Sequence, residues 1–353
     1  KWEIEMGAQV TDNDLSNDFE LQDFTDGIWV FNQGFTNVFD FRQKVFGLYG
    51  TVSFESDKWG IKLGLRREHT NTETNLVNSN LSNSRNFADL FPTLHSSFKL
   101  IKKLSLQLGY SRRIYRPSLW QLNPFINIRN NFNISAGNPD LRPEYSDSYE
   151  LAAIYNTSGL SINCGIYQLN TTEKITYVTS LENNISKRSP ENLGSSNANG
   201  IEINGKLDIS KIIVMTSDFN LNRFNRRGIW GSQNFNFNGT RWSSEFRSKI
   251  KFPKDLDIEL TLNYLSEYRT VDGERGPSRN INFGVRKKIV EGRGGINLMV
   301  RDIFGTRVNE SRAIRSNFIV NNWSTSGTFF SLGFSYGFGK GEAMEYQSKG
   351  GRR

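Results

Sequence analysis

A polar stretch at residues 115–143 carries the side chains best suited to hold a ligand. Its aromatic rings offer flat stacking surfaces, and its amide and guanidinium groups offer hydrogen-bond donors. A sugar, a peptide or a chelate could bind to such a mixture. The candidate ligand-binding residues are Arg116, Trp120, Asn123, Phe125, Asn127, Arg129 and Phe132. The stretch could instead fold into a loop that caps its surroundings with its own side chains, and the sequence leaves both interpretations open.

Catalytic chemistry finds no support in the sequence. The two histidines, His69 and His95, accompany no nucleophile turn, HExxH motif or glycine-rich phosphate loop. The single Cys164 excludes an internal disulfide framework and a Cys-rich metal site. An acidic run at residues 12–20 could hold a cation, but a solvated loop explains it better, because the glycine and spacing of a calcium loop are missing. We therefore expect no enzymatic activity, no cofactor and no metal site.

The elements that must position the polar stretch are β-strands. Apolar side chains alternate with polar ones from residues 2–10 to residues 330–338, and this period of two is typical of half-buried strands. About fourteen segments follow the pattern, most with roughly the 9–11 residues that span a bilayer when tilted. No run approaches the roughly 18 apolar residues of a membrane-spanning helix. A strand barrel fits this modest hydrophobicity, because only every second residue faces lipid.

The connections between these segments alternate between short and long. Short ones lie at residues 56–58, 102–103, 156–159, 208–210, 253–254 and 291–294, and long polar ones at about 11–42, 70–89, 115–143, 178–197, 223–240, 267–279 and 302–326. Short periplasmic turns and long outer loops are typical of outer-membrane barrels. A soluble sheet with one solvated face would explain the alternation but not this asymmetry.

The polar face of the predicted strands indicates a wet lumen. In residues 241–252, Trp242 and Phe246 alternate with charged residues such as Arg247 and Lys249. A Lys or Arg at the bilayer midplane costs about 2–4 kcal/mol, so these charges must face inward, into a wide, hydrated or plugged barrel. Aromatic residues gather at strand ends, where interfacial girdles would place them: Trp2, Trp59, Tyr110, Tyr155, Trp242, Phe252, Tyr264 and Phe338.

The chain is basic, with a formal net charge of +8, but its basic residues are spread over the whole length. This distribution argues against nucleic acid as a partner. Arginines of the outer loops could meet lipopolysaccharide phosphates, or could simply be solvated: Arg223, Arg226, Arg227, Arg269, Arg275, Arg279, Arg312 and Arg315. We predict an all-β, antiparallel transmembrane barrel over residues 1–339 and a polar tail over 340–353. The last apolar strand has the form of a barrel-assembly signal, which makes the assembly machinery an expected partner.

Five motifs, in order, resemble the barrel of TonB-dependent outer-membrane receptors and in particular the outer membrane protein beta-barrel family. They are FPTL at 91–94, YSRR at 110–113 with RPS at 116–118, GNPDLRPE at 137–144 leading to SYEL at 148–151, NLG at 192–194 with GIE at 200–202, and VRDIF at 300–304. The resemblance spans about residues 40–340.

The resemblance implies a receptor of the Gram-negative outer membrane with 22 strands, of which this chain would be the C-terminal part. A signal, a plug and further strands would precede residue 1, and a TonB-type complex would drive uptake of an unidentified nutrient ligand. The alternative function is a structural or adhesive outer-membrane barrel without active transport. A soluble carbohydrate-binding β-protein is a third possibility.

Overall fold

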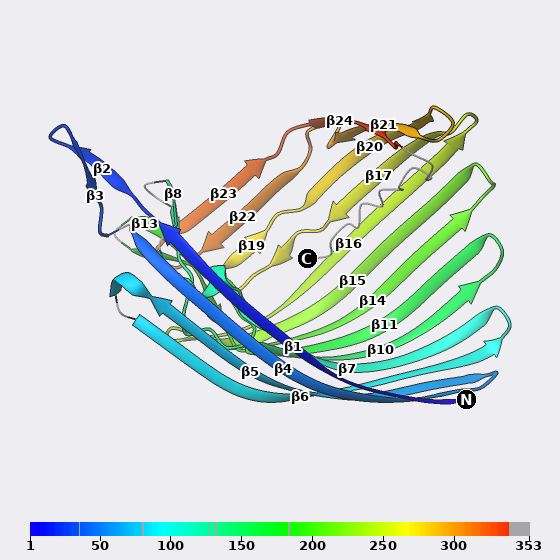
Figure 1. Ribbon diagram of the computed structural model, residues 1–353, viewed down its shortest axis with the longest axis horizontal. Coiled ribbons are helices and arrows are strands. Elements are labelled where there is room, and N and C mark those ends of the chain that lie inside the picture. The colour runs from blue at the N-terminus through cyan, green and yellow to red at the C-terminus, as the bar shows by residue number, and fades with distance from the viewer. Residues whose placement is uncertain (35, 80, 126, 131–132, 183, 339–353) are drawn as a thin grey trace.

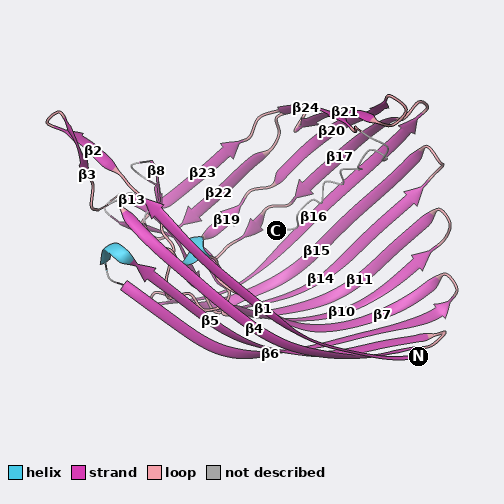
Figure 2. Cartoon of the chain, viewed as in Figure 1, coloured by secondary structure: helices cyan, strands magenta, loops and turns pink. Residues whose placement is uncertain are grey.

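The computed structural model describes residues 1–338 except 35, 80, 126, 131–132 and 183. Its main element is a 14-stranded antiparallel sheet that curves into a partial barrel (Figures 1 and 2). In spatial order its strands are β1 (Trp2–Phe19), β4 (Asn37–Glu55), β5 (Trp59–Leu76), β6 (Leu81–Ile101), β7 (Leu104–Tyr115), β10 (Glu144–Asn156), β11 (Leu160–Thr172), β14 (Ser195–Asp208), β15 (Ile213–Trp230), β16 (Gln233–Phe252), β17 (Leu256–Leu265), β20 (Ser278–Ile289), β21 (Gly294–Arg301) and β24 (Phe329–Tyr336). The predicted all-β architecture is confirmed.

Smaller elements lie in the long connections. They are the hairpin β2 (Gln22–Thr25) with β3 (Ile28–Phe31), the 3-10 turn η1 (Val77–Ser79), the single helical turn α1 (Leu119–Leu122), the sheet of β12 (Ile175–Glu182), β13 (Ile185–Asn192), β9 (Asn133–Ser135) and β8 (Asn127–Asn130), and the sheet of β18 (Tyr268–Arg269), β19 (Gly273–Arg275), β22 (Val308–Ile314) and β23 (Ile319–Thr325). Among the described residues, no helix has the length and apolar character needed to cross a bilayer.

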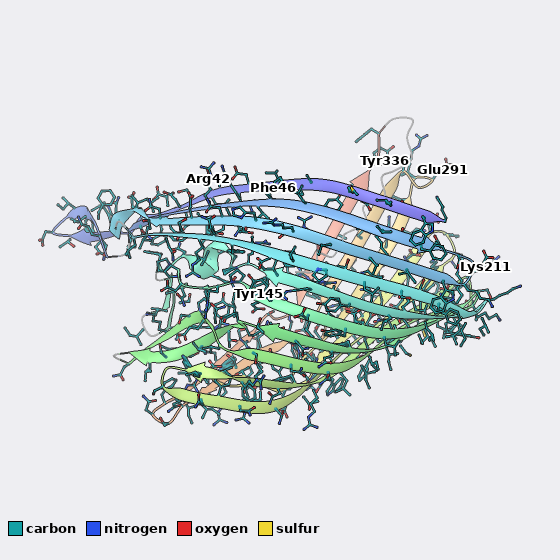
Figure 3. The ribbon with its side chains drawn as sticks, turned by 90° about the horizontal axis from the view of Figure 1, so that it is seen from below. Arg42, Phe46, Tyr145, Lys211, Glu291 and Tyr336 are labelled. Atoms are coloured by element: carbon teal, nitrogen blue, oxygen red, sulfur yellow. The ribbon has the colours of Figure 1, made fainter. Side chains whose placement is uncertain are left out.

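The two ends of the sheet differ as expected. The short turns and the N-terminus gather at one end, where Figure 3 also shows Lys211 and Glu291, and the small sheets and α1 gather at the other (Figures 1 and 3). We call these the turn end and the loop end. Every strand of the main sheet pairs with its spatial neighbours alone, so β1 and β24 are its two edges, and no pairing joins them within the described residues.

Strand register places the predicted apolar residues on one continuous surface. Directly opposed residues on neighbouring strands share a face, because side chains alternate with a period of two. One row of direct partners crosses six strands through Leu108, Leu151, Ile166, Ile201, Leu221 and Trp242. Large apolar side chains on this surface are strongly exposed, such as Leu332 at 75%. An uncovered apolar band of this kind is the surface that a barrel presents to lipid.

Aromatic pairs border the apolar band on both sides. Toward the loop end, Trp242 stacks on Tyr264 with ring centroids 4.3 Å apart, and Tyr110 lies 5.0 Å from Tyr149. Toward the turn end, the ring centroids of Trp59 and Phe98 lie 4.4 Å apart, and the rings of Trp2 and Phe54 also pack against each other. Such paired rings match the interfacial girdles that the sequence predicted.

The opposite face of the sheet carries the predicted charges, and many of them are paired. Lys249 lies 2.9 Å from Asp257, and Arg247 lies 2.9 Å from Glu245 and 3.5 Å from Glu259. These side chains remain 27–46% exposed, so they line an open, wettable lumen and do not fill it.

Two predicted outer loops are wrong. The stretch 70–89 consists mostly of paired strand, because β5 continues to Leu76 and β6 begins at Leu81; similarly, β15 and β16 extend through most of 223–240. Beyond the apolar band the outward side chains of these strands are mostly polar, and the aromatic residues of β16, Phe235 and Phe237, lie on the inner face. The lipid-facing alternation therefore ends although the backbone pairing continues. Hydrophobic periodicity therefore reports only the part of each strand that faces lipid.

Candidate functional site at the loop end of the barrel

A seam opens between β6 and β7 at the loop end. The pairing of β6 with β5 extends out to Leu81, whereas its pairing with β7 stops at Thr93, opposite Ser111. Residues 116–143 follow β7, and their described part lies beside this seam, where Asn83 and Arg85 of β6 donate to the carbonyls of Pro139 and Leu141. We call residues 116–143 the inward loop.

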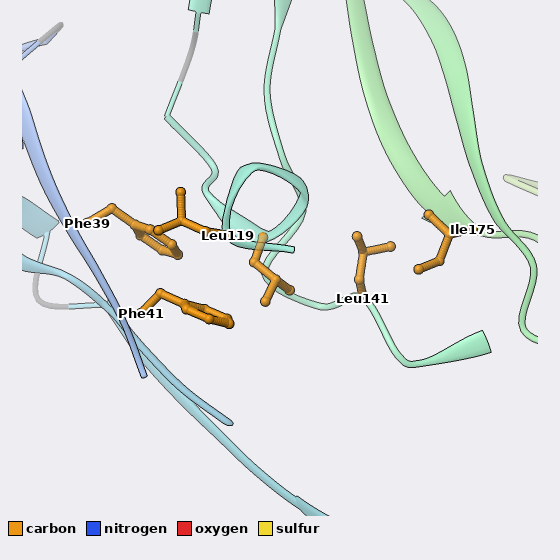
Figure 4. Packing of buried hydrophobic residues seen from close by; sticks show 6 residues of the cluster. Phe39, Phe41, Leu119, Leu141 and Ile175 are labelled. Carbon is orange, nitrogen blue, oxygen red and sulfur yellow. The ribbon is translucent and has the colours of Figure 1, made fainter. Parts of the chain in front are cut away.

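The inward loop is fixed by a small apolar cluster. Leu119, Leu122 and Leu141 pack against Phe39 and Phe41 of β4, with Ile175 and Leu76 completing the cluster (Figure 4). Phe39 and Phe41 share the parity of Val45 and Tyr49, opposite to that of the outward-facing Phe46 and Leu48. The loop therefore packs on the inner face of β4, inside the barrel.

A buried ion-pair network joins the loop to β5. Arg116 donates from Nη2 to Glu68 Oε2 at 2.5 Å and to Thr70 Oγ1 at 2.9 Å, and Arg66 Nε donates to Glu68 Oε1 at 2.5 Å. Arg116 also lies over the ring of Phe87, 5.9 Å from its centroid. Arg67 and His69, which flank Glu68, are exposed and polar on the outer face, so this network lies beyond the apolar band. We call it the Glu68 latch.

The charge state of the latch is well defined. Burial raises the pKa of Glu68, but the hydrogen bonds from Arg116 and Arg66 outweigh burial and leave that pKa below its ordinary value. Glu68 is only 8% exposed, and at neutral pH it is an anion held between two guanidinium groups.

Within the inward loop, the start of the GNPDLRPE motif is hydrogen-bonded to the C-terminal end of α1. The Gly137 N–H donates to Asn123 O at 2.8 Å, and the Asn138 N–H donates to Gln121 O at 2.7 Å. A Cβ on Gly137 would lie 2.5 Å from Asn123 O and 2.6 Å from Gln121 O, which no side chain permits. The glycine therefore allows the two backbones to approach closely enough for both bonds.

The same motif bridges two other walls of the barrel. On one side, Arg85 of β6 donates to Leu141 O at 2.8 Å, close to the open seam. On the other side, Asn192 at the end of β13 donates to Arg142 O at 2.9 Å and accepts from the Arg142 N–H at 2.7 Å. Glu144 accepts from Lys174 at 2.8 Å and from the Ile175 N–H at 2.6 Å. The motif is a structural clasp that ties the loop to β6 and to the β12–β13 hairpin.

The VRDIF motif serves a comparable purpose at the loop end near the other edge of the sheet, beside β24. Asp302 is 3% exposed, and its carboxylate accepts from the N–H groups of Thr306 at 2.9 Å and Arg307 at 2.8 Å. These bonds begin the connection from β21 toward β22. The GNPDLRPE and VRDIF motifs thus both shape backbone turns.

The predicted ligand-binding residues take different positions. Arg116 belongs to the Glu68 latch, and Asn123 is 5% exposed with its side chain 3.4 Å from that of Asn17. Trp120 is 69% exposed, and Phe125 lies against Phe19 with ring centroids 5.0 Å apart. The side chains of Asn127 and Arg129, both in β8, and the whole of Phe132 lie outside the described part of the chain.

The arginines predicted in outer loops divide between the two faces. Arg223 and Arg279 share the outward parity of their partners Thr240 and Tyr264, and Arg227 is exposed on that same face of β15. Arg226 has the opposite parity, shared with Asn220 and Asn222, so it faces the lumen. That parity is readable in the sequence once β15 is known to continue beyond the apolar band.

The acidic run of β1 meets basic partners on β4. Asp12 lies 3.7 Å from both Arg42 and Lys44, and Asp14 lies 3.9 Å from Arg42. Within the described residues, no group of three or more His, Cys, Asp or Glu side chains is arranged to hold a metal ion.

Comparisons with known proteins agree with this architecture. The model of the outer membrane protein beta-barrel family matches residues 1–336. The chain belongs to this family. No curated protein matches it, but solved structures share the fold. The ferric yersiniabactin uptake receptor FyuA from Yersinia pestis is 14% identical with a TM-score of 0.61, and the alignment covers 95% of this chain and 51% of that one.

Two further structures extend the comparison. The copper transporter OprC is 11% identical with a TM-score of 0.66, over 96% of this chain and 55% of that one. The ferric enterobactin receptor PfeA from Pseudomonas aeruginosa is 13% identical with a TM-score of 0.54, over 94% and 60%. This chain thus spans 51–60% of the length of these three proteins. The resemblance drawn from the motifs is confirmed, and the family places the barrel in the outer membrane.

Proposed function

We propose that this barrel binds a nutrient at its loop end and admits it through the lumen, as part of a receptor powered by a TonB-type complex. The observation that carries the proposal is the charged inner wall, on which residues such as Lys249 and Asp257 pair yet remain accessible. A structural barrel needs no wettable path, whereas a transport barrel does. The similar receptors handle ferric chelates and copper, and they are barrels of transporters and receptors, not enzymes.

Capture would begin on the inward loop. Trp120 presents its ring to solvent, and Phe125, Asn127, Arg129 and Phe132 follow in the same loop. Arg116 and Asn123 act by holding the loop in place, since their polar groups already have partners. Lipopolysaccharide would contact the outward Arg223, Arg227 and Arg279, because guanidinium groups match phosphate geometry.

The experiment uses the full-length protein in its own cells. Uptake of ferric citrate, a ferric catecholate, Cu(II) and a maltooligosaccharide is compared between wild type and a deletion strain, with and without an uncoupler of the proton gradient. We expect one of the four to enter only in the wild type and only without the uncoupler.

Site variants then test the inward loop. W120A should lower that uptake at least tenfold at an unchanged amount of barrel in the membrane. W323A is the matched control, because Trp323 on β23 is similarly exposed at 72%. Equal uptake in W120A and W323A would remove the inward loop from the binding site. Intact uptake of all four in the deletion strain, with a weakened envelope, would favour a structural barrel.

A further inference from the structure

The outward face of the barrel carries a broad polar surface at the loop end of β11, β14, β15 and β16. Strand register arranges it in three rows of direct partners, stacked outward from the apolar row that contains Leu221 and Trp242. The first row is Gln168, Asn199, Arg223 and Thr240, the second is Asn170, Asn197, Asn225 and Asn238, and the third is Thr172, Ser195, Arg227 and Asn236. We call these three rows the amide surface.

The amide surface contains cations and neutral polar groups but no carboxylate. Its amides are linked across the strands, since Asn197 donates to Asn170 and Asn225 Nδ2 donates to Asn238 Oδ1 at 3.1 Å. An amide offers both donors and an acceptor, which is the combination that sugar hydroxyl groups require. The surface therefore suits a ligand made of sugars that also carries negative charge.

The two arginines of the amide surface are available to such a ligand. Both Arg223 and Arg227 are exposed. Arg227 Nε donates to Ser195 Oγ at 3.3 Å, which orients the guanidinium group but leaves its other donors free. Within the described part of the chain, the side chain of Arg223 forms no hydrogen bond or ion pair. The paired outward Arg42, 3.7 Å from Asp12, shows the opposite arrangement on β4.

An open hollow of about 490 Å³ lies beside Arg227, where β14 begins while β15 and β16 continue outward. This volume is within the range of about 300–1,000 Å³ that is typical of small-molecule sites. Residues with outward parity line much of the hollow: Thr172, Ser195, Arg227, Ile229 and Asn234. Gly194 of the NLG motif also lines it, with a φ of +60°, and a Cβ there would clash with Arg227 O. Glu173 at the rim is paired with Arg142 at 2.9 Å.

The heights of the two arginines above the apolar band differ. Arg223 lies two residues beyond Leu221 on β15, and Arg227 lies six residues beyond it (227 − 221). With about 3.3 Å per residue and a strand tilt of about 40°, these spacings correspond to heights of about 5 Å and about 15 Å. The headgroup layer of a phospholipid is only about 5–7 Å thick. A phospholipid could therefore reach Arg223 but not Arg227.

We propose that the amide surface binds one lipopolysaccharide molecule, with Arg223 on a phosphate of lipid A and Arg227 with its hollow on a phosphorylated sugar of the core. The amide rows between them would bind sugar hydroxyl groups. This inference rests on the lipopolysaccharide contact of the proposed function and deepens it, because it assigns separate parts of the lipid to separate residues. Lipopolysaccharide has a headgroup tall enough to span both arginines, and guanidinium groups match phosphate geometry.

The test measures lipid binding to the purified full-length protein in detergent by native mass spectrometry. The probes are lipid A, a lipopolysaccharide with a phosphorylated core, a lipopolysaccharide of equal length whose core lacks phosphate, and phosphatidylglycerol. We expect the phosphorylated core to strengthen binding at least tenfold over lipid A and over the unphosphorylated core. Phosphatidylglycerol should bind more weakly than lipid A.

Variants separate the two arginines. R227Q should abolish the advantage of the phosphorylated core and leave lipid A binding unchanged, whereas R223Q should weaken binding of lipid A and of both lipopolysaccharides by the same factor. R42Q is the matched control, because Arg42 is also outward but is already paired, and it should change none of these affinities. Each variant is first shown to be folded by its heat-modifiable mobility.

Three results would overturn the proposal. The first is equal binding of the phosphorylated and unphosphorylated cores by wild type, and the second is a core-phosphate advantage that survives in R227Q. The third is displacement of lipopolysaccharide by excess inorganic phosphate, which would make Arg227 a site for the free anion.

The uptake assay decides the transport function independently. If binding of the phosphorylated core depends on Arg227 while wild-type cells take up none of the four uptake probes, the lipid site stands and the transport function fails. If a probe is taken up while R227Q binds the phosphorylated core as wild type does, the transport function stands and the lipid site fails.

Discussion

Replacing Glu68 with Gln tests the latch that holds the inward loop. The carboxylate accepts two charge-assisted hydrogen bonds of 2.5 Å, from Arg66 and Arg116. Each such bond contributes about 1.5–3 kcal/mol, and the partly exposed side chains of Arg66 (29%) and Arg116 (17%) favour the lower end. A Gln keeps one neutral acceptor, so about 2 kcal/mol of loop stability should be lost. At 1.4 kcal/mol per factor of ten, the fraction of molecules in which the inward loop is open should rise roughly 30-fold.

Hydrogen exchange at the clasp reads this population directly. The amides of Gly137 and Asn138 bond to the carbonyls of the α1 segment and exchange only when the loop opens. In E68Q they should exchange roughly 30-fold faster. The matched control is E274Q, because Glu274 pairs with Arg312 at 3.6 Å on the exposed surface of the same end, where an ion pair contributes about 0–1 kcal/mol. Unchanged exchange in E68Q, or equal acceleration in both variants, would refute the role of the latch.

The pH dependence of the wild type gives the latch a second signature. The pKa of Glu68 is lower in the folded protein than in the unfolded chain, so its contribution is fully present above the unfolded value, about 4.3. The contribution is lost as pH falls through the folded pKa. Protection of the clasp amides, corrected for intrinsic rates, should stay constant from about pH 8 to 5 and decline only in more acidic solution. E68Q should show no such decline.

Two further substitutions test the assignment of the faces and of the clasp. L151R places a charge on the lipid-facing side of β10, between Tyr149 and Tyr155, and should destabilise the inserted barrel by about 2–4 kcal/mol. We expect less heat-modifiable barrel in the outer membrane for L151R, whereas E150R, on the lumen face, should leave the yield near wild type. Equal yields of the two variants would contradict the orientation of the sheet. N192A removes the bonds of Asn192 to Arg142 and should speed hydrogen exchange of the Arg142 amide severalfold without loss of the barrel. Unchanged exchange would show that the clasp does not depend on β13.

The membrane-facing part of the fold was predictable from the sequence because it obeys a single rule. Each lipid-facing side chain must be apolar and its neighbours along the strand need not be, so residues such as Leu151 and Ile166 reveal their strands without any knowledge of pairing. The order of the strands followed too, since short turns force neighbours to pair. The number of strands and the polarity of the lumen are therefore properties of the linear pattern.

The loop end was predictable only in part. Residues 70–89 and 223–240 looked like loops because their outward side chains are no longer apolar where lipid ends, while strand pairing continues through them. The sequence singled out residues 115–143 and the GNPDLRPE motif, but it could not distinguish a ligand platform from a loop that satisfies its own polar groups.

Only the tertiary structure showed, residue by residue, which polar groups of the loop end already have partners. Arg116 finds Glu68, 48 positions earlier in the chain, and Arg142 meets Asn192, 50 positions later. Arg315 reaches Trp230 across a distance of 85 positions (315 − 230) in the sequence. Periodicity within one strand carries no information about such partners, because register and loop folding bring them together. The sequence by itself thus determined which face meets the membrane, and the tertiary structure determined which polar groups at the loop end are already paired and which remain available to a ligand.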